Sequence, residues 1–486
     1  MKFKNQYILT NKEINPANNS IKLKIGDYNL FIDEETNYTT YNEKITLIGY
    51  VFHCYNSNTE EEILKDIIKL RDEERLDEID KLCGHFVLII HDKDVNIYTD
   101  ASSSFKVFYG KEKEYFFVGS DPKTLLLFHD FKKHTVKEKL KFYTSNYFLN
   151  DKTKVGNECR YENIFQLLSN HCLELNSFSE KRVFPRKERK EKSQAEASDL
   201  LVPIFKNIIT QIEKRYTIFT SITAGYDSRL LMSSTKSISD KTTYYTFKLP
   251  NVTEGFIDYT IPKKIADDLD LNYKSVKINE LDEDTIEEIE NTYDLPKIRP
   301  FQQYKNIFPE NKKPNILLVG FVSEVAKNYL ERVKVNSGKD VVRAIHSPDN
   351  KYLEDYYQNW LNQNKETIKN YGYELLDFIH WEQDISNFAG QNTHYANHYV
   401  NLFSIFNSRE IMKIMLSVNP KYRDGKNTIF FRYLINKMWP ELLNYPFNPT
   451  FKDKLILFMK KIKIYRLYKY LQIKFHKNGE VKWEEK

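Results

Sequence analysis

The segment S-I-T-A-G-Y-D-S-R, residues 221–229, decides the fold, because it joins a short apolar strand to a helix through a turn of small residues. The apolar run 217–222 predicts the strand, and a helix is expected from Asp227 to Ser234. The turn contains Gly225, and a glycine can take a positive φ at little cost. A strand, a tight turn and a helix in this order leave backbone N–H groups at a helix N-terminus. Such groups bind anions, and phosphate especially.

Polar side chains surround this turn. Hydroxyl groups of Ser221, Thr223 and Ser228 adjoin the N–H groups, and Asp227 lies where the helix begins. A carboxylate alone repels phosphate, so Asp227 indicates Mg²⁺ held between the carboxylate and the phosphates. Composition alone leaves an alternative open, which is an ordinary strand–helix turn with a glycine and an Asp or Ser cap.

The chain beyond residue 199 alternates between strands and helices. Strands are expected at 242–247, 273–278 and 315–320, and helices at 200–214, 258–268 and 282–293. The pattern is helical from about 350 to 445. This alternation predicts a parallel sheet that is covered by helices on both faces.

The first part of the chain is rich in strands instead. The run 45–52 predicts a strand, the period of 60–70 predicts a helix, and 86–99 reads as a hairpin. A charged run from 180 to 198, rich in Lys and Glu, is typical of a solvated linker. We therefore expect one domain over residues 1–180, a linker at 181–198, a second domain over 199–450, and a tail at 451–486.

Composition narrows the class of protein. A chain of 486 residues with 41% hydrophobic and 29% charged residues fits a soluble globular protein of two or three domains. A net charge of +5 is small for this length and does not favour nucleic-acid binding. The four cysteines form no C-x-x-C pair, which argues against zinc ribbons and thioredoxin-like sites. The sequence shows no signal-peptide pattern and no long apolar run, so we expect a cytoplasmic protein.

Two motifs resemble the ATP pyrophosphatase family that includes the asparagine synthetases. T-A-G-Y-D-S at 223–228 resembles the pyrophosphate loop S-G-G-x-D-S, and V-G-F-V-S-E at 319–324 resembles the motif S-G-x-G-x-D/E. The stretches 82–88 and 100–109 resemble strands of the glutaminase half of asparagine synthetase. The resemblance implies an α/β fold: an N-terminal Ntn-like α/β/β/α sandwich, then a doubly wound parallel-sheet ATP pyrophosphatase domain with a helical C-terminal part.

The same resemblance implies that ATP and Mg²⁺ bind at these motifs. Asp227 and Glu324 would be the catalytic, metal-binding carboxylates, although a charge at a helix N-terminus is the alternative for Glu324. A loop of this kind implies attack at the α-phosphate, with an AMP ester formed and pyrophosphate released. The residues implied in nucleotide binding are Ser221, Thr223, Ala224, Gly225, Tyr226, Ser228, Arg229, Phe247, Gly320 and Ser323.

Two departures from the family limit what the resemblance implies. Lys2 stands where a glutaminase of this type has a cysteine, so glutamine hydrolysis is not expected. Phe321 replaces an acidic residue that lies close to the substrate in asparagine synthetases, so aspartate is not expected as the substrate. We therefore expect an amide-forming ligase that acts on a small-molecule carboxylate and an amine. The alternatives are a modification enzyme of a glycan or peptide precursor, and a nucleotide-binding pseudoenzyme or partner-binding protein.

The C-terminal tail is basic and aromatic. Between residues 451 and 476, lysines interleave with leucine, isoleucine, phenylalanine and tyrosine. The pattern is typical of an amphipathic helix at a membrane surface, and a solvated C-terminal helix is the alternative. The family carries a phosphate-contacting lysine near its C-terminal end, for which Lys426, Lys452 and Lys454 are candidates. No nucleic-acid partner is expected.

Overall fold

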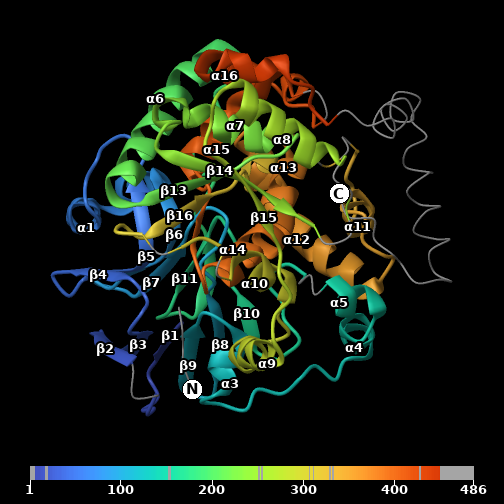
Figure 1. Cartoon of the computed structure of the whole chain (residues 1–486). Helices are drawn as coiled ribbons and strands as arrows, with labels where there is room; N and C mark the ends of the chain where they lie inside the picture. Colours follow the sequence, from blue (N-terminus) through green and yellow to red (C-terminus); the bar gives the residue numbers. More distant parts are fainter. Residues whose placement is uncertain are drawn as a thin grey trace.

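A computed structural model describes residues 6–448, apart from 17–19, 152–154, 250–251, 253–254, 306, 310, 328–329, 331–332 and 426–427. The described residues fold into mixed α/β structure with two antiparallel sheets and one parallel sheet (Figure 1). Lys2, the three candidate lysines near the C-terminus and the tail at 451–486 lie outside the described residues.

One antiparallel sheet has the strand order β10-β8-β9-β1-β3-β2. On its outer face, Ile8 and Phe117 pack against Leu125 of the short helix α3. The elements are β1 (Tyr7–Thr10), β2 (Ser20–Ile25), β3 (Tyr28–Asp33), β8 (Phe108–Glu112), β9 (Tyr115–Gly119), β10 (Ile164–Gln166) and α3 (Pro122–Leu126).

The other antiparallel sheet has the order β12-β11-β7-β6-β5-β4. On its outer face, Leu47 and Leu88 pack against Ile63 and Ile67 of α1, which begins at a capping box formed by Thr59 and Glu62. The elements are β4 (Tyr38–Tyr41), β5 (Ile45–His53), β6 (Leu82–Ile90), β7 (Asn96–Thr99), β11 (His171–Glu174), β12 (Ser179–Arg182), α1 (Glu60–Lys69) and α2 (Asp72–Asp80).

The two antiparallel sheets share a buried core. Ile48 and Val87 of one sheet lie in the same apolar cluster as Leu9 and Leu30 of the other. Because successive side chains of a strand point to opposite faces, their neighbours face the outer helices instead. The N-terminal part therefore has four layers, in the order helix, sheet, sheet, helix. The expectation of a strand-rich N-terminal part is confirmed.

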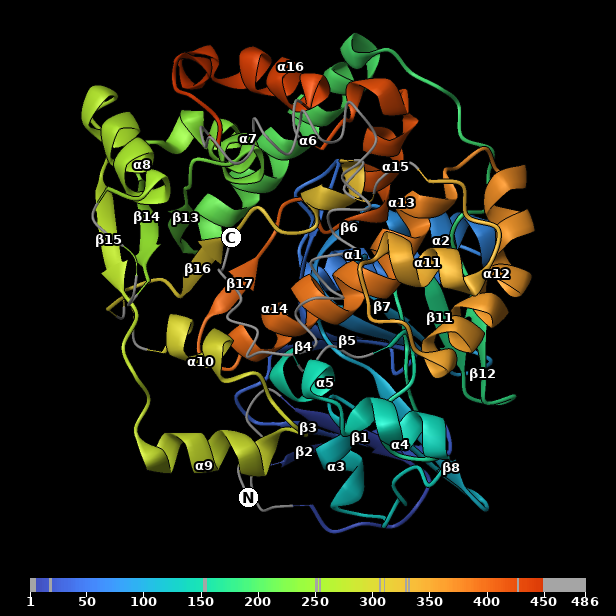
Figure 2. The same ribbon diagram turned by 90° about the vertical axis from the view of Figure 1, so that its right-hand side faces the viewer.

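The parallel sheet has the order β15-β14-β13-β16-β17, and all four of its neighbouring pairs are parallel. Figure 2 shows α6, α7 and α8 on one side of it and α10 and α14 on the other, which confirms a parallel sheet covered on both faces. The elements are β13 (Thr217–Ser221), β14 (Thr242–Lys248), β15 (Tyr273–Lys277), β16 (Asn315–Leu318), β17 (Asn401–Phe403), α6 (Gln194–Arg215), α7 (Tyr226–Ser234), α8 (Ile257–Asp268), α10 (Ile298–Tyr304) and α14 (Gln391–Ala396).

Further helices complete the described chain. Among them is a π-helix, η3 (His380–Gly390), which follows directly on α13. The others are α4 (Lys137–Tyr143), α5 (Asn146–Asp151), α9 (Glu283–Thr292), α11 (Gly338–Ala344), α12 (Lys351–Asn370), α13 (Leu375–Ile379), α15 (Arg409–Ser417), α16 (Ile429–Met438) and the short 3₁₀ helices η1 (Lys236–Ile238), η2 (Ser323–Ala326), η4 (Pro420–Tyr422) and η5 (Pro440–Asn444).

The structure differs from the sequence-based expectation in the charged run and in the helical region. α6 begins at Gln194, inside the expected linker, because Ser193 and Glu196 form a capping box there. Arg182, also in that run, is not solvated but pairs with the fully buried Glu382. The strand β17 lies in the stretch expected to be helical, and it pairs with β16 at the sheet edge.

The antiparallel and parallel sheets are held together by a shared interface. The ring of Phe52 on β5 lies 5.3 Å from that of Phe403 on β17, and the Tyr50 hydroxyl donates to the carbonyl of Leu402 at 3.1 Å. Nearby, Nδ2 of Asn407 donates to Oδ1 of Asp100 at 2.9 Å. The N-terminal part therefore supports the sheet that carries the candidate site.

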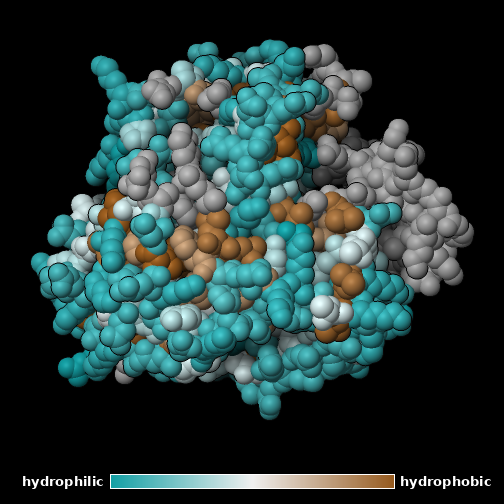
Figure 3. Space-filling view, turned by 90° about the horizontal axis from the view of Figure 1, so that it is seen from below, coloured by the Kyte–Doolittle hydropathy of each residue, from teal (hydrophilic) through white to brown (hydrophobic). Residues whose placement is uncertain are grey.

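The face of the molecule seen from below in Figure 1 is mostly hydrophilic, with hydrophobic patches in its central region (Figure 3). Among the described residues, no helix has the length and apolar character needed to cross a membrane.

Candidate functional site

The candidate site lies where the strand order of the parallel sheet reverses. β13 is central, and the next strand on one side is β14, whereas on the other side it is β16. Thr220 of β13 pairs with Leu318 of β16, so the segments that follow these two strands leave the sheet side by side. In open α/β sheets, ligands bind outside the carboxyl ends of the strands at such a switch point.

The loop after β13 is closed by hydrogen bonds between its own hydroxyl and amide groups. The Thr223 and Ser228 hydroxyls lie 2.8 Å apart, and the amide of Thr223 donates to Oγ of Ser228 at 3.0 Å. The amide of Gly225 donates to Oγ1 of Thr223 at 3.1 Å. The amide of Ala224 donates to a carboxylate oxygen of Asp258, on α8, at 2.8 Å. An anionic oxygen therefore already lies against the backbone of this loop.

Asp227, in the first turn of α7, is bonded to the segment after β16. Its Oδ1 accepts a hydrogen bond from the hydroxyl of Ser323 at 2.5 Å, and its Oδ2 accepts one from Nζ of Lys327. The side chain of Lys327 is only 9% exposed and that of Asp227 is 25% exposed. A partly buried ion pair therefore joins the two motifs.

Glu324 provides a second carboxylate near Asp227. Its Oε2 atom is buried and accepts no hydrogen bond from the described part of the chain. Burial, and then the negative charge of Asp227, raise the pKa of Glu324 from 4.5 to about 7, while the charges of Lys327 and His380 oppose this shift. Because a bound cation favours the ionised carboxylate, the affinity of Glu324 for a cation increases as the pH rises through this range.

Gly320 allows the two motifs to come into contact. A Cβ at this position would lie 2.8 Å from the carbonyl carbon of Asp227 and 3.0 Å from the amide nitrogen of Ser228. These distances are shorter than van der Waals contact, and both neighbours are backbone atoms that other bonds hold in place. A side chain at position 320 would therefore push the two motifs apart.

Replacing Gly320 with alanine is accordingly expected to lower the free energy of unfolding by about 1–3 kcal/mol, measured by urea denaturation. Gly255→Ala is a matched control, because a Cβ there meets no described atom within 4 Å. We expect the control to change stability by less than about 0.5 kcal/mol. Equal stabilities of the two variants would contradict the close backbone packing.

Val322 has an unusual backbone conformation. Its φ is 73°, in the left-handed region that β-branched residues rarely adopt, and its side chain is buried. This is the position at which the resembling motif has its second glycine, and the positive φ gives the physical reason for a glycine there.

Glycine and alanine at position 322 provide a test of this strain, because both remove the buried side chain. Alanine normally stabilises a chain relative to glycine, but a positive φ costs an L-residue about 1–2 kcal/mol. We therefore expect Val322→Gly to have a higher free energy of unfolding than Val322→Ala, by about 1 kcal/mol in urea denaturation. The opposite order would mean that the backbone relaxes out of the left-handed region.

Arg229 lies behind the loop, in the protein interior. Its guanidinium group donates to the carbonyl oxygen of Tyr445 at 2.8 Å and to that of Ala224 at 3.3 Å, and it lies 4.0 Å from the ring of Phe447. The ring of Tyr226 stacks on the same phenylalanine at 4.2 Å. In this structure Arg229 and Tyr226 thus hold residues 445–447 against the loop, and their contact with a nucleotide stays a prediction.

The structure brings together most of the residues singled out in the sequence. Thr223, Ala224, Gly225, Asp227, Ser228, Gly320, Ser323 and Glu324 lie on the two adjoining motifs. Ser221 ends β13 beside them. Phe247 packs against the ring of Tyr304 at 5.5 Å, on the face covered by α10.

Two charged residues of the site were missed in the sequence. Asp258 was taken only as the start of a helix, although it follows β14 and faces the loop. Lys327 stands three residues after Glu324, which lies in η2, and it follows directly on that helix. Residues three apart share one side of a 3₁₀ helix, so this spacing was the available signal.

The cysteines do not form a reactive site. All four are buried and none of them forms a disulfide. Cys54 lies just after β5. Burial raises the pKa of the Cys54 thiol from 9.0 to about 12. A thiolate nucleophile is therefore not favoured at this cysteine.

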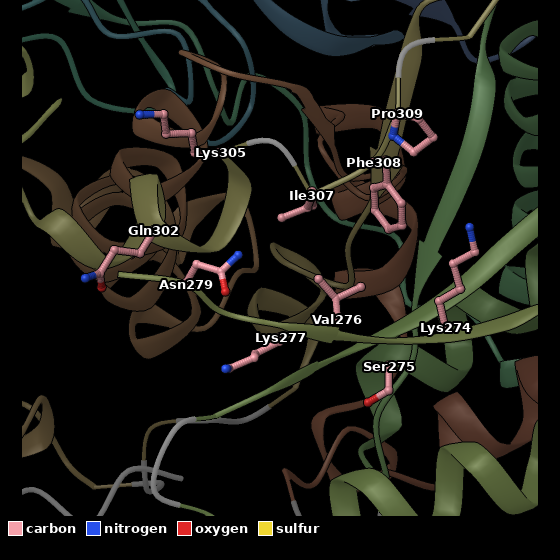
Figure 4. A pocket seen from close by; sticks show the side chains of 10 residues that line it. All are labelled: Lys274, Ser275, Val276, Lys277, Asn279, Gln302, Lys305, Ile307, Phe308 and Pro309. Carbon is pink, nitrogen blue, oxygen red and sulfur yellow. The ribbon is translucent and has the colours of Figure 1, made fainter. Parts of the chain in front are cut away.

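A separate cavity of about 420 Å³ lies at the edge of the parallel sheet that β15 forms. It is formed by β15 and the residues that end and follow α10, with Val276, Ile307 and Phe308 near its centre and lysines around them (Figure 4). Its three lysines are Lys274, Lys277 and Lys305. None of the residues predicted to bind nucleotide or metal lines this cavity.

Comparisons with known proteins do not identify this chain. No family model and no curated protein matches it. Among solved structures, the glutamine phosphoribosylpyrophosphate (PRPP) amidotransferase from B. subtilis, complexed with ADP and GMP, covers 61% of the chain at 8% identity, with a TM-score of 0.17. The chain spans 62% of the length of that protein. A similarity this weak does not indicate a function for this chain.

Proposed function

We propose that this protein is an ATP-dependent, AMP-forming ligase of the asparagine synthetase-like type, which activates a carboxylate and joins it to an amine. The observation that carries the proposal is the meeting of Asp227 and Glu324 at the switch point of a doubly wound sheet, beside the loop 223–228. Carboxylates from two different strand ends, next to an amide-lined loop, suit a nucleotide whose phosphates are bound with a divalent cation.

The residues of the site are compatible with Mg²⁺. Asp227 and Glu324 supply hard carboxylate oxygens, and Oε2 of Glu324 is buried without a donor among the described residues. When bound there, Mg²⁺ would neutralise negative charge on the departing pyrophosphate. The phosphates themselves would take the loop amides, where a carboxylate oxygen of Asp258 now lies against Ala224.

In the proposed reaction, an oxygen of the substrate carboxylate attacks the α-phosphorus of ATP. The bond from the α-phosphorus to its bridging oxygen breaks, and pyrophosphate leaves with the electron pair. An amine then attacks the carbon of the acyl-adenylate, AMP leaves, and an amide forms. Ser323 and Lys327 fix the orientation of Asp227 for this chemistry. The raised pKa of Cys54 gives no support to a glutamine-hydrolysing thiol, so we propose that the amine comes from the substrate.

We further infer that residues 1–180 form an Ntn-like domain, which serves as a scaffold for the ATP pyrophosphatase domain at 199–450. The support is the four-layer order of the N-terminal part and its contacts with the parallel sheet, such as that between Asp100 and Asn407.

The proposal is tested by incubating the protein with ATP, Mg²⁺ and panels of carboxylates and amines, and by measuring AMP and pyrophosphate. We expect the two products in equal amounts, and only when a carboxylate is present. Carboxyl-bearing glycan and peptide precursors belong in the panel, because they test the alternative substrate class. Formation of ADP and phosphate instead would overturn the proposal.

One observation favours a second candidate, a protein that binds nucleotide without turnover. Both carboxylate oxygens of Asp227 are already bonded to Ser323 and Lys327, and the amide of Ala224 is bonded to Asp258. A ligand must displace or share these bonds. Tight nucleotide binding without AMP formation, across the same panel, would favour this candidate.

A further inference from the structure

Lys327 is held in the centre of the candidate site by the backbone that presents Glu324. It follows directly on η2 (Ser323–Ala326), and its amide donates to the carbonyl oxygen of Glu324 at 3.0 Å. Its side chain is almost buried, and Nζ bonds Oδ2 of Asp227. The lysine is therefore part of the same turn that carries one of the two carboxylates.

The position of this ammonium group resembles that of a bound cation. It neutralises Asp227 directly, and its charge also acts on Glu324, whose ionisation it favours. An ammonium group has three hydrogen-bond donors, so it can bond a carboxylate and phosphate oxygens at the same time. Lysine binds phosphate as a compact point charge, whereas arginine binds it through a planar fork.

We propose that Lys327 is a built-in cation that occupies the place of one divalent ion at Asp227 and contacts the phosphates of the bound nucleotide. This inference rests on the proposed nucleotide-binding function of the same site. It implies that a single divalent ion, bound at Glu324, suffices, and that nucleotide binding has a component that does not require metal.

We expect Lys327→Met to raise the affinity for a metal ion and to lower the affinity for a nucleotide. Loss of the ammonium group releases Asp227, so the nucleotide-free variant should bind Mn²⁺ at least about tenfold more tightly, measured by electron paramagnetic resonance. Without the ammonium group, the affinity for ATP in EDTA should fall by at least about tenfold, measured by equilibrium dialysis. Lys327→Arg keeps the charge beside Asp227, so its Mn²⁺ affinity should remain within about threefold of the wild type.

Three outcomes separate this inference from the proposed function. If wild type and Lys327→Met bind ATP only with metal and with equal affinity, the proposed role of Lys327 as a built-in cation is wrong. Nucleotide binding at the site would still stand. If Lys327→Met weakens ATP binding equally with and without metal and leaves Mn²⁺ binding unchanged, Lys327 is only a structural partner of Asp227. If the wild type binds no nucleotide under any condition, the proposed function and this inference both fail.

Discussion

Replacing Asp227 with asparagine is expected to lower the release of AMP and pyrophosphate by about 10³-fold, or about 4 kcal/mol of transition-state stabilisation. Asparagine has the same shape and can still accept the hydrogen bond from Ser323. It carries no charge to pair with Lys327, so the ammonium group that lies beside the phosphates loses its counter-charge. The loss should therefore appear in the chemical step, measured both as product release and as ATP–pyrophosphate exchange.

The matched control is Asp267→Asn on α8, which removes an exposed carboxylate that pairs with Lys263 four residues earlier. We expect this control to leave product release within about twofold of the wild type, because exposed ion pairs contribute little. Thermal unfolding of both variants separates a loss of chemistry from a loss of folding. Unchanged ATP–pyrophosphate exchange in Asp227→Asn would remove Asp227 from the mechanism.

The strands that build the candidate site could be predicted from the sequence. The run 217–222 is apolar and is bounded by small or charged residues, which is the pattern of a strand buried on both faces. The structure places β13 at Thr217–Ser221, with α7 starting one residue before the expected position. The local signals were strong here because strand, turn and helix follow one another without interruption.

Other features depend on contacts between distant parts of the chain. β17 has only three residues, and it is a strand because it pairs with β16, as in the pairing of Leu402 with the distant Leu317. No periodicity is detectable in so short a run. The roles of Lys327 and Arg229 were hidden for a similar reason, since each is defined by a partner on another segment, Asp227 and Tyr445 respectively.

The motif at 319–324 keeps one glycine of the motif that it resembles and replaces the other. Gly320 is retained where a Cβ would collide with the backbone of Asp227. Val322 departs from glycine although its φ is positive, and its buried side chain offsets part of the strain by packing in the core. The sequence alone shows that Val322 replaces the glycine of the motif, but only the backbone geometry shows that this replacement is costly.

Breaking the buried ion pair of Arg182 and Glu382 is expected to have the largest effect on stability. Two guanidinium nitrogens of Arg182 donate to the carboxylate oxygens of Glu382 at 2.6 and 2.9 Å, and the carboxylate is completely buried. Arg182→Met leaves this carboxylate without its counter-charge, so we expect the free energy of unfolding to fall by about 3–5 kcal/mol. Urea denaturation near neutral pH measures the loss.

Two variants serve as controls for this prediction. Lys187→Met breaks the exposed pair with Asp77, and we expect a loss of less than about 1 kcal/mol. The double variant Arg182→Met with Glu382→Leu removes both buried charges, so it should lose less stability than the two single variants added together. A double variant that loses the full sum would show that the two charges do not interact.

The pair of Arg182 and Glu382 also makes the free energy of unfolding depend on pH. Burial opposes the ionisation of Glu382, but the charge and hydrogen bonds of Arg182 prevail and lower its pKa below the ordinary 4.5. A carboxylate with a lowered folded-state pKa stabilises the fold above its unfolded pKa, and this contribution is lost as the pH falls. In Arg182→Met, burial is opposed only by the remaining groups, such as the hydrogen bond from Asn170, so the pKa of Glu382 rises and its ionisation favours folding less. The difference in unfolding free energy between wild type and variant should therefore grow from about pH 4 to about pH 7. A difference that shrinks over this range would contradict the assignment of Glu382 as the ionised partner.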